Sequence, residues 1–127
     1  MDKQFLNKYF RDFSDLVSPT SEIVMSLIEL KNALLAASEN GKRVIIVGNG
    51  GSASIASHFS VDLTKNAGIL CINFNESDLI TCFANDYGYE KWVEKAVEFY
   101  GDEGDVLIAI SSSGSSKNIL NGCQAAR

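Results

Sequence analysis

The chain has 127 residues, of which 46% are apolar and 21% charged, and its formal net charge at pH 7 is −5. This length and composition are typical of one globular domain with its own apolar core, so folding requires neither disulfides nor a structural metal. An acidic balance without a cluster of Lys or Arg argues against a nucleic-acid partner, because nucleic-acid binding depends on cations that neutralise phosphates.

Two helices are expected before the first strand. Apolar and aromatic side chains recur at helical spacing over residues 2–17. A second helix is expected to begin at Ser18-Pro19, with Ser18 as its cap, and to end at Asn40-Gly41. Its wide apolar stripe packs either on the protein's own sheet or on a helix of another subunit. The stripe consists of Ile23, Val24, Leu27, Ile28, Leu30, Leu34 and Leu35.

From residue 41 onward, apolar strands alternate with helices. Strands so apolar indicate an α/β fold, an open parallel sheet with helices on both faces. Three strands are fewer than the roughly five or six of a usual open sheet, so the last strands are expected to be missing. We therefore divide the chain into N-terminal helices for packing or oligomerisation (1–40) and an incomplete ligand-binding domain (41–127). Strands are expected at 43–47, 69–74 and 105–110, and helices at about 53–65, 77–84 and 90–100, with a closing helix after 116.

The cysteines and the N-terminus indicate a cytoplasmic protein. Cys71, Cys82 and Cys123 form no metal-binding pattern, and Cys71, inside an apolar run, is expected to be a reduced core thiol. The N-terminal residues do not resemble a signal peptide. No apolar run approaches the roughly 20 residues that cross a bilayer, so no membrane partner is expected.

Two short loops, each after an apolar strand and before a helix, hold the candidate binding residues. They are Gly48-Asn49-Gly50-Gly51-Ser52 and Ser111-Ser112-Ser113-Gly114-Ser115-Ser116. Helix N-termini leave backbone N–H groups unpaired and carry partial positive charge, so they stabilise an anion without Lys or Arg. Because parallel strands end at the same sheet edge, both loops can converge on one ligand. The sequence predicts a site for a phosphorylated small molecule.

A dinucleotide site is the main alternative for the first loop, because Gly48-x-Gly50-x-x-Ala53 also fits the dinucleotide pattern. That pattern needs an acidic residue at the tip of the next strand, which here reads Asn73-Phe74-Asn75 with Glu76 just beyond. The serines of the second loop supply hydroxyl donors for which a simple dinucleotide domain has no need. No nucleotide cofactor is therefore expected, although a flexible Ser/Gly connection remains the alternative for the second loop.

Candidate chemistry lies on the helix that the first loop opens. His58 and Asp62 are four residues apart and share a face of this helix. They form either a surface ion pair or part of a site, with the carboxylate as a general base or both side chains as metal ligands. Asp86, in an expected loop at 85–88, is either a turn residue or a polar group in the same cleft.

Three segments carry a resemblance to a known family: GNGGSASIASHFSVDLTK, CFANDYGYEKWVEKAV and GDEGDVLIAISSSGSSKNIL. In this order and spacing they resemble the sugar isomerase (SIS) domain, and within it the phosphoheptose isomerase family, over most of residues 15–127. The resemblance implies a flavodoxin-like SIS fold and a homotetramer with N-terminal helices at its subunit contacts. It also implies conversion of sedoheptulose 7-phosphate into a D-glycero-D-manno-heptose 7-phosphate, for activated-heptose and surface polysaccharide biosynthesis.

The resemblance also implies roles for individual residues. His58 matches a histidine that binds zinc in some members, and Asp62 matches the glutamate proposed as isomerisation base and further zinc ligand, with a side chain one methylene shorter. Asp86 matches an aspartate that contacts the sugar. The remaining implied contacts to phosphate and sugar come from Asn49, Gly50, Gly51, Ser52, Ser111, Ser112, Ser113 and Ser116.

A non-catalytic phosphosugar-binding or protein-interaction module is the alternative function. In the family, later helices supply a histidine as partner acid and a glutamine, and neither has a counterpart before Arg127. SIS domains also occur in regulators, and one related family assists the bacterial replication initiator. Phosphosugar binding without turnover would select this alternative.

Overall fold

Three parallel strands organise the chain. In the computed structural model, which describes residues 2–127, β1 (Val44–Gly48) lies between β2 (Cys71–Asn73) and β3 (Val106–Ile110). Val44 is the register partner of Cys71 on one side and of Val106 on the other. All of β1 is buried, as a central strand covered on both faces must be.

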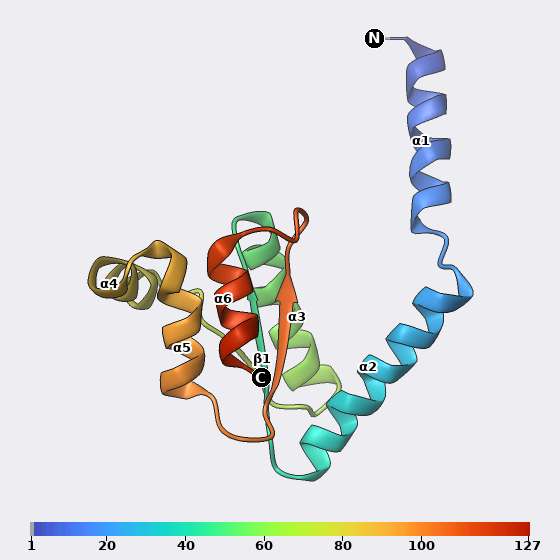
Figure 1. The fold of residues 1–127 in the computed structure, drawn as a ribbon. Coiled ribbons are helices and arrows are strands. Elements are labelled where there is room, and N and C mark those ends of the chain that lie inside the picture. The colour runs from blue at the N-terminus through green and yellow to red at the C-terminus, as the bar shows by residue number, and fades with distance from the viewer. Residues whose placement is uncertain (1) are drawn as a thin grey trace. The chain divides into compact units, whose positions relative to one another are not determined.

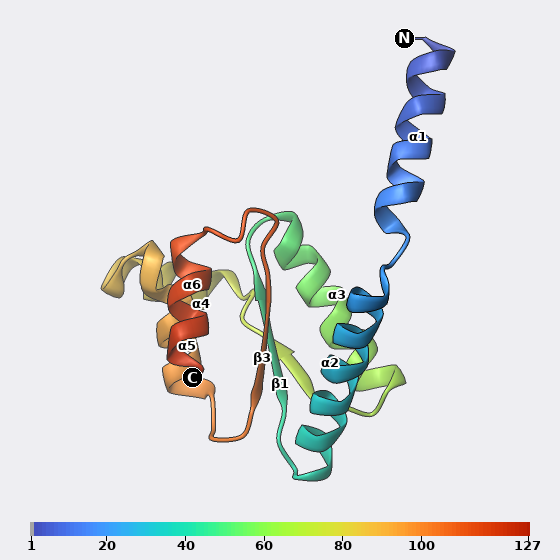
Figure 2. The same cartoon turned by 45° about the vertical axis from the view of Figure 1, so that its right-hand side comes forward.

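Helices cover both faces of this sheet (Figures 1 and 2). Helix α3 packs on β1 and β2, and α5 and α6 pack against each other on the opposite face. The predicted α/β fold is therefore confirmed. The helices are α1 (Lys3–Val17), α2 (Ser21–Glu39), α3 (Gly51–Asn66), α4 (Ser77–Tyr87), α5 (Trp92–Tyr100) and α6 (Lys117–Ala125), with the 3-10 helix η1 (Tyr89–Lys91) before α5.

The core lies between β1 and the pair α5 and α6. Trp92 and Val93 of α5 are buried there with Ile45 and Val47 of β1. Gly122 allows the close approach of α6, because a Cβ at this position would overlap the side chain of Val93. These contacts fix α6, and with it the loop that precedes α6.

On the other face, Thr64 joins α3 to β2. Its Oγ1 accepts a hydrogen bond from the N–H of Cys71 at 3.0 Å and donates one to the Cys71 carbonyl at 3.2 Å. The predicted core thiol is confirmed, since Cys71 is buried and free. Burial raises the pKa of the Cys71 thiol to about 11, so the thiol stays protonated at neutral pH.

Several element boundaries differ from the prediction. Ser18 does not cap the second helix: it is extended, as residues before proline prefer, and its hydroxyl donates to the Ser14 carbonyl in α1. Thr20 takes the capping role instead, with Oγ1 3.3 Å from the N–H of Ile23. Strand β2 ends at Asn73, earlier than predicted, because the Asn73 side chain accepts the N–H of Asn75 in a local turn.

The prediction of a loop at 85–88 is also wrong. Helix α4 continues to Tyr87, since no helix-breaking residue precedes Gly88. Gly88 ends the helix with φ +90°, and its N–H donates to the Ala84 carbonyl at 3.0 Å. Asp86 therefore lies in the last turn of a helix.

The contacts divide the chain into two compact units, up to Asn32 and from Ala33 onward. The second unit contains the sheet and the candidate site. In the first, every residue of α1 is exposed, including the aromatic rings of Phe10 and Phe13. Among residues 2–127, the longest apolar helices fall short of what a membrane crossing requires.

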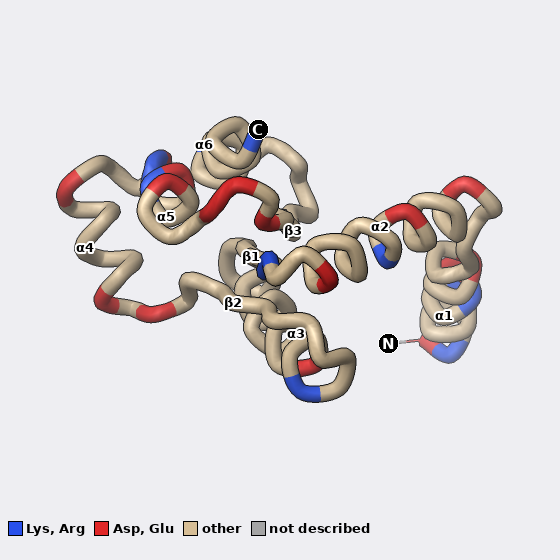
Figure 3. The backbone as a smooth tube through the Cα atoms, turned by 90° about the horizontal axis from the view of Figure 1, so that it is seen from below, with Lys and Arg blue, Asp and Glu red and all other residues tan. Residues whose placement is uncertain are grey.

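An ion-pair network joins the amino ends of β1 and β3, beside the acidic turn between α5 and β3 (Figure 3). Arg43 Nε donates to Asp105 Oδ2 at 2.9 Å, and the Arg43 backbone N–H donates to Asp105 Oδ1 at 3.1 Å. The same guanidinium reaches Asp102 Oδ2 at 2.9 Å. The Asp105 side chain is only 7% exposed, so these hydrogen-bond partners, rather than water, stabilise its negative charge.

This network predicts acid-sensitive stability. Burial alone would raise the pKa of Asp105, but hydrogen bonds from Arg43 and Asp102, with the Arg43 charge, hold that pKa below its ordinary value of 3.8. The stabilisation is present above pH 3.8 and is lost as the pH falls through the lower folded-state pKa. We expect Asp105→Asn to lower the free energy of unfolding near neutral pH by about 1–3 kcal/mol, with the deficit shrinking in acid.

Urea unfolding at neutral pH and in acid measures this difference. Asp102→Asn is the control, because its side chain is 73% exposed and its loss should have little effect. An Asp105→Asn deficit that stays constant from neutral pH into acid would contradict the assignment.

Candidate functional site

The two predicted loops leave the sheet side by side. Gly48, the last residue of β1, is the register partner of Ile110, the last residue of β3. Residues 49–50 and 111–116 therefore begin at neighbouring points of the carboxyl edge, before α3 and α6 (Figure 2). Open α/β sheets bind ligands at this edge.

The first loop is a tight turn that depends on glycine. A Cβ at Gly48 would lie 2.6 Å from the carbonyl carbon and 2.7 Å from the carbonyl oxygen of Ser52. Gly50 has φ +54°, which side chains rarely adopt, and it precedes the first residue of α3. Within the described chain, no side chain caps α3, and the N–H groups of Ser52 and Ala53 donate to the Asn49 carbonyl of the loop.

The second loop is ordered by its own serines. Ser111 Oγ accepts the N–H of Gly114 at 3.1 Å, and Ser113 Oγ accepts the N–H of Ser115 at 3.2 Å. A hydroxyl has one proton and two acceptor positions, so both serines keep a proton for a ligand oxygen. Ser116 is the N-cap residue of α6, and over residues 2–127 its hydroxyl makes no capping bond. The hydroxyls and the α6 N-terminus thus offer donors to an anion.

Asn118 and Tyr89 were not predicted, yet they connect the loops. The amide of Asn118, in the first turn of α6, bonds to the amide of Asn49 in both directions. The Tyr89 hydroxyl, in η1, lies 3.3 Å from Asn49 Oδ1. Their positions are the only signal in the sequence: Asn118 comes two residues after Ser116, and Tyr89 comes three residues after Asp86.

His58 and Asp62 lie on the exposed side of α3. His58 Nε2 is 3.6 Å from Asp62 Oδ2, with side chains 82% and 50% exposed. Asn66 Nδ2 donates to Asp62 Oδ1 at 3.1 Å. By helical rise, Asp62 lies about 16 Å along the axis from the start of α3. The structure therefore separates this carboxylate from the anion-binding loops by about three turns of α3.

Asp86 is exposed in the last turn of α4, where its Oδ1 accepts a bond from Asn85 Nδ2 at 3.0 Å. The segment that follows borders the first loop through Tyr89. Asp86 itself makes its hydrogen bonds within α4 rather than with the loops, as far as residues 2–127 describe them.

Two asparagines at the end of β2 bond to α3. Asn75 Nδ2 donates to the Ala53 carbonyl at 2.8 Å and to Ser57 Oγ at 2.7 Å. Asn73 Nδ2 donates to Ser60 Oγ at 2.9 Å. The position where a dinucleotide-binding domain places its ribose-binding carboxylate is thus taken by amides that hold α3.

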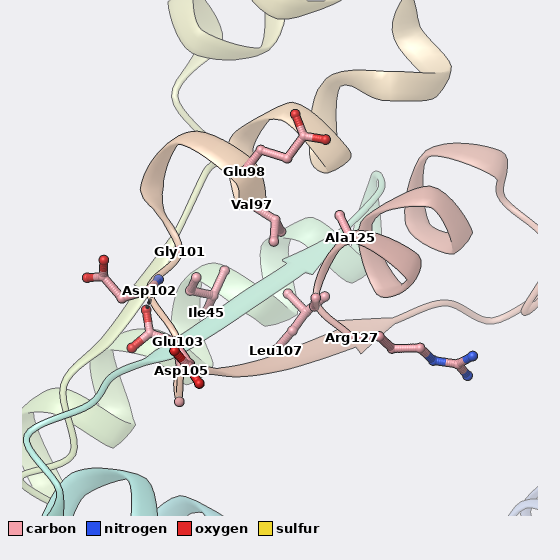
Figure 4. Close-up of a pocket in the computed structure, with 12 residues that line it drawn as sticks. Ile45, Val97, Glu98, Gly101, Asp102, Glu103, Asp105, Leu107, Ala125 and Arg127 are labelled. Carbon is pink, nitrogen blue, oxygen red and sulfur yellow. Dashed lines mark hydrogen bonds between the residues drawn. The ribbon is translucent and has the colours of Figure 1, made fainter.

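A hollow of about 350 Å³ lies at the opposite end of the sheet (Figure 4). Ile45 and Leu107 form part of its wall, and four acidic residues and one arginine also line it: Glu98, Asp102, Glu103, Asp105 and Arg127. This excess of negative charge disfavours a phosphate. The hollow therefore does not compete with the loops as an anion site.

Comparison with known proteins agrees with this geometry. The chain matches the SIS domain family over residues 8–127. It is 34% identical over 134 residues to phosphoheptose isomerase from Helicobacter pylori strain P12, a match covering all of this chain and 70% of the relative. Identity to the phosphoheptose isomerase of Hamiltonella defensa is 38% over 129 residues, covering 98% and 59% of the two chains.

Solved structures give the same result. The structure of phosphoheptose isomerase GmhA from Neisseria gonorrhoeae superimposes with a TM-score of 0.89 at 28% identity, covering 98% of this chain and 68% of that one. A phosphoheptose isomerase from Francisella tularensis also gives 0.89, at 29% identity, covering 99% and 69%.

A parallel sheet with helix-opening loops at its carboxyl edge, matched over residues 8–127, defines an SIS domain. Within that class, the chain belongs to the phosphoheptose isomerase family. The chain spans 59% to 70% of the length of these two curated relatives.

Proposed function

We propose that the two loops bind the phosphate of a seven-carbon sugar phosphate, and that the protein interconverts sedoheptulose 7-phosphate and D-glycero-D-manno-heptose 7-phosphate. The observation that carries this proposal is the register pairing of Gly48 with Ile110, because it brings both loops to one point of the sheet edge. The identity of the proposed sugar comes from the phosphoheptose isomerase family to which the chain belongs.

The phosphate is held without a dedicated cation. Lys117, at the start of α6, is paired with the carboxylate of Glu90 at 3.9 Å, so we do not assign it to the phosphate. The remaining donors are the N-termini of α3 and α6 and the hydroxyls of Ser52, Ser111, Ser113 and Ser116. Backbone N–H groups at helix N-termini suit a phosphate without further positive charge.

The isomerisation moves one proton between adjacent carbons. We assign Asp62 as the base that removes a proton from C1 of the ketose, giving an enediolate, and returns a proton to C2. The hydroxyl proton on O1 is lost and O2 gains one, so the carbonyl passes from C2 to C1. The phosphate on C7 is at the far end of the sugar from C1 and C2, so the loops and the base would act on opposite ends of the substrate.

Zinc is proposed as a metal of this site. His58 Nε2 and Asp62 Oδ2 are 3.6 Å apart, close to the roughly 3.3 Å between two ligands of a tetrahedral zinc. An imidazole and a carboxylate are ordinary zinc ligands, so this pair would supply two of the four ligands of a tetrahedral zinc. Residues 2–127 contain no group of three or more His, Cys, Asp or Glu that could complete the set. When bound there, zinc would polarise a substrate oxygen.

We further propose a homotetramer in the cytoplasm. Support for assembly comes from α1, on which Phe10 is 64% and Phe13 52% exposed, because apolar faces of this kind are covered in oligomers. Three free thiols are in keeping with a reducing compartment.

Replacing Phe10 and Phe13 together by glutamate is expected to reduce the mass of the assembly, because buried charges at an interface are costly. Light scattering after size-exclusion chromatography measures that mass. Asn7→Glu, on the same helix at an exposed polar position, is the control. A double variant with the mass of the wild type would rule out α1 as the subunit contact.

The proposed reaction is tested by offering sedoheptulose 7-phosphate to this chain and to a version extended to the full domain length of its relatives. Binding by both and turnover by the extended version are expected. Binding without turnover would favour the non-catalytic module. If the extended version neither binds nor converts the sugar, the proposed function is wrong.

A further inference from the structure

Asn118 is a buried polar residue between the two loops. It is 3% exposed, in the first turn of α6. Its Nδ2 donates to Asn49 Oδ1 at 2.8 Å, and its Oδ1 accepts from Asn49 Nδ2 at 3.0 Å. These partners are 69 residues apart in the chain. The amide pair is therefore a direct tie between the first loop and the helix that the second loop opens.

We propose that Asn118 is a positioning residue of the phosphate site, which holds Asn49 and the first loop in register with the second. This inference rests on the proposed function for its ligand. Asn118 would act through Asn49, without itself touching the sugar phosphate.

The hydrogen bonds of the Asn49 side-chain amide support this role. Its Oδ1 accepts from Asn118 Nδ2 and lies 3.3 Å from the Tyr89 hydroxyl, so both lone pairs of that oxygen have partners. Its Nδ2 uses one proton on Asn118 Oδ1. Within residues 2–127 the second proton of this Nδ2 has no acceptor, so it can bond to a phosphate or sugar oxygen. Asn118 thereby fixes which edge of the Asn49 amide remains for the ligand.

The amide pair also holds the backbone of the first loop. The Asn49 carbonyl accepts the N–H of Ser52 at 3.0 Å and that of Ala53 at 3.4 Å, in the turn that starts α3. Tethering the Asn49 side chain to α6 thus fixes the residue from which α3 begins. Loss of the Asn49–Asn118 amide pair should therefore increase the mobility of residues 49–52 before it affects the sheet.

Asn121, one turn later in α6, provides a matched control. Its Nδ2 donates to the Glu90 carbonyl at 2.8 Å, so it also ties α6 to a distant segment. That bond does not involve the first loop. Loss of a generic contact of α6 would affect both variants, whereas loss of loop positioning would affect only Asn118→Ala.

The experiment measures two quantities for the wild type, Asn118→Ala, Asn49→Ala, the double variant and Asn121→Ala. The first is the dissociation constant for sedoheptulose 7-phosphate, by calorimetry. Asn118→Ala and Asn49→Ala should each weaken binding about tenfold, and the double variant should bind about as weakly as Asn49→Ala alone. Asn121→Ala should remain within about twofold of the wild type.

The second quantity is the hydrogen-exchange rate of the backbone amides at 50–52, which needs no ligand. Asn118→Ala should raise it about tenfold, and Asn121→Ala should leave it unchanged. If Asn118→Ala does not fold, Asn118→Asp takes its place in this measurement, since aspartate keeps the acceptor for Asn49 Nδ2 and replaces the donor to Asn49 Oδ1 by a second acceptor oxygen.

Multiplicative losses of affinity in the double variant, or unchanged exchange at 50–52, would overturn the role of Asn118. If the wild type does not bind the sugar phosphate, the proposed function fails. Faster exchange at 50–52 would then still support the tether, and unchanged exchange would refute it.

Discussion

Replacing Asp62 by asparagine is expected to lower kcat for the interconversion of the two heptose phosphates by about 10²–10⁴-fold. The amide cannot accept the proton from C1, so proton transfer between carbons loses its base. Affinity for the sugar phosphate should change little, because the phosphate is held by loops some 16 Å away along α3. Steady-state kinetics of the extended chain measures kcat, and calorimetry measures binding.

Asp62→Glu is the matched control for this prediction. It keeps the carboxylate and lengthens the side chain by one methylene. The carboxylate of Asp62 is half exposed, which leaves room for an added methylene. We expect Asp62→Glu to retain activity. If Asp62→Asn is as active as the wild type, the base lies elsewhere.

Gly48→Ala is expected to abolish phosphosugar binding and to lower the free energy of unfolding by about 1–3 kcal/mol. The added Cβ would lie 2.6 Å from the Ser52 carbonyl carbon, a backbone atom that no side-chain rotation can move away. The start of α3 would have to shift, and with it the N–H groups proposed to hold the phosphate. Urea unfolding and calorimetry measure the two effects.

Gly51→Ala serves as the comparison for this second prediction. A Cβ at Gly51 meets nothing within 4 Å, and Gly51 has no positive φ. Alanine at such a position reduces the freedom of the unfolded chain, so stability should stay level or rise by about 0.4–1 kcal/mol. Equal losses of binding in both variants would show that the steric argument for Gly48 is wrong.

The parts of the structure that local patterns determine could be predicted from the sequence. Apolar runs at 43–47 and 105–110 predicted β1 and β3 to within one residue at each end. The rule that parallel strands end at a common edge then placed both loops together, and the register of Gly48 with Ile110 agrees with it. Burial of Cys71 followed from its place in an apolar run.

What the sequence could not give were contacts between distant segments. The pairing of Asn49 with Asn118 depends on how α6 packs, which Gly122 and Val93 decide, and no local pattern reports it. The polar, turn-favouring residues 85–87 predict a loop, but they continue α4, because only Gly88 breaks the helix. The turn preference of these residues is weaker than the tendency of α4 to continue.

The central claim is that the two loops form one site for a sugar phosphate. Its most direct test is a titration of the isotope-labelled chain with sedoheptulose 7-phosphate, followed by the NMR shifts of its backbone amides, with NAD as the comparison ligand. We expect saturable shifts in both 49–52 and 111–117 with the sugar phosphate, and none with NAD. Shifts in one loop alone, shifts at the acidic hollow around Glu98 and Asp102, or binding of NAD instead of the sugar phosphate would contradict it.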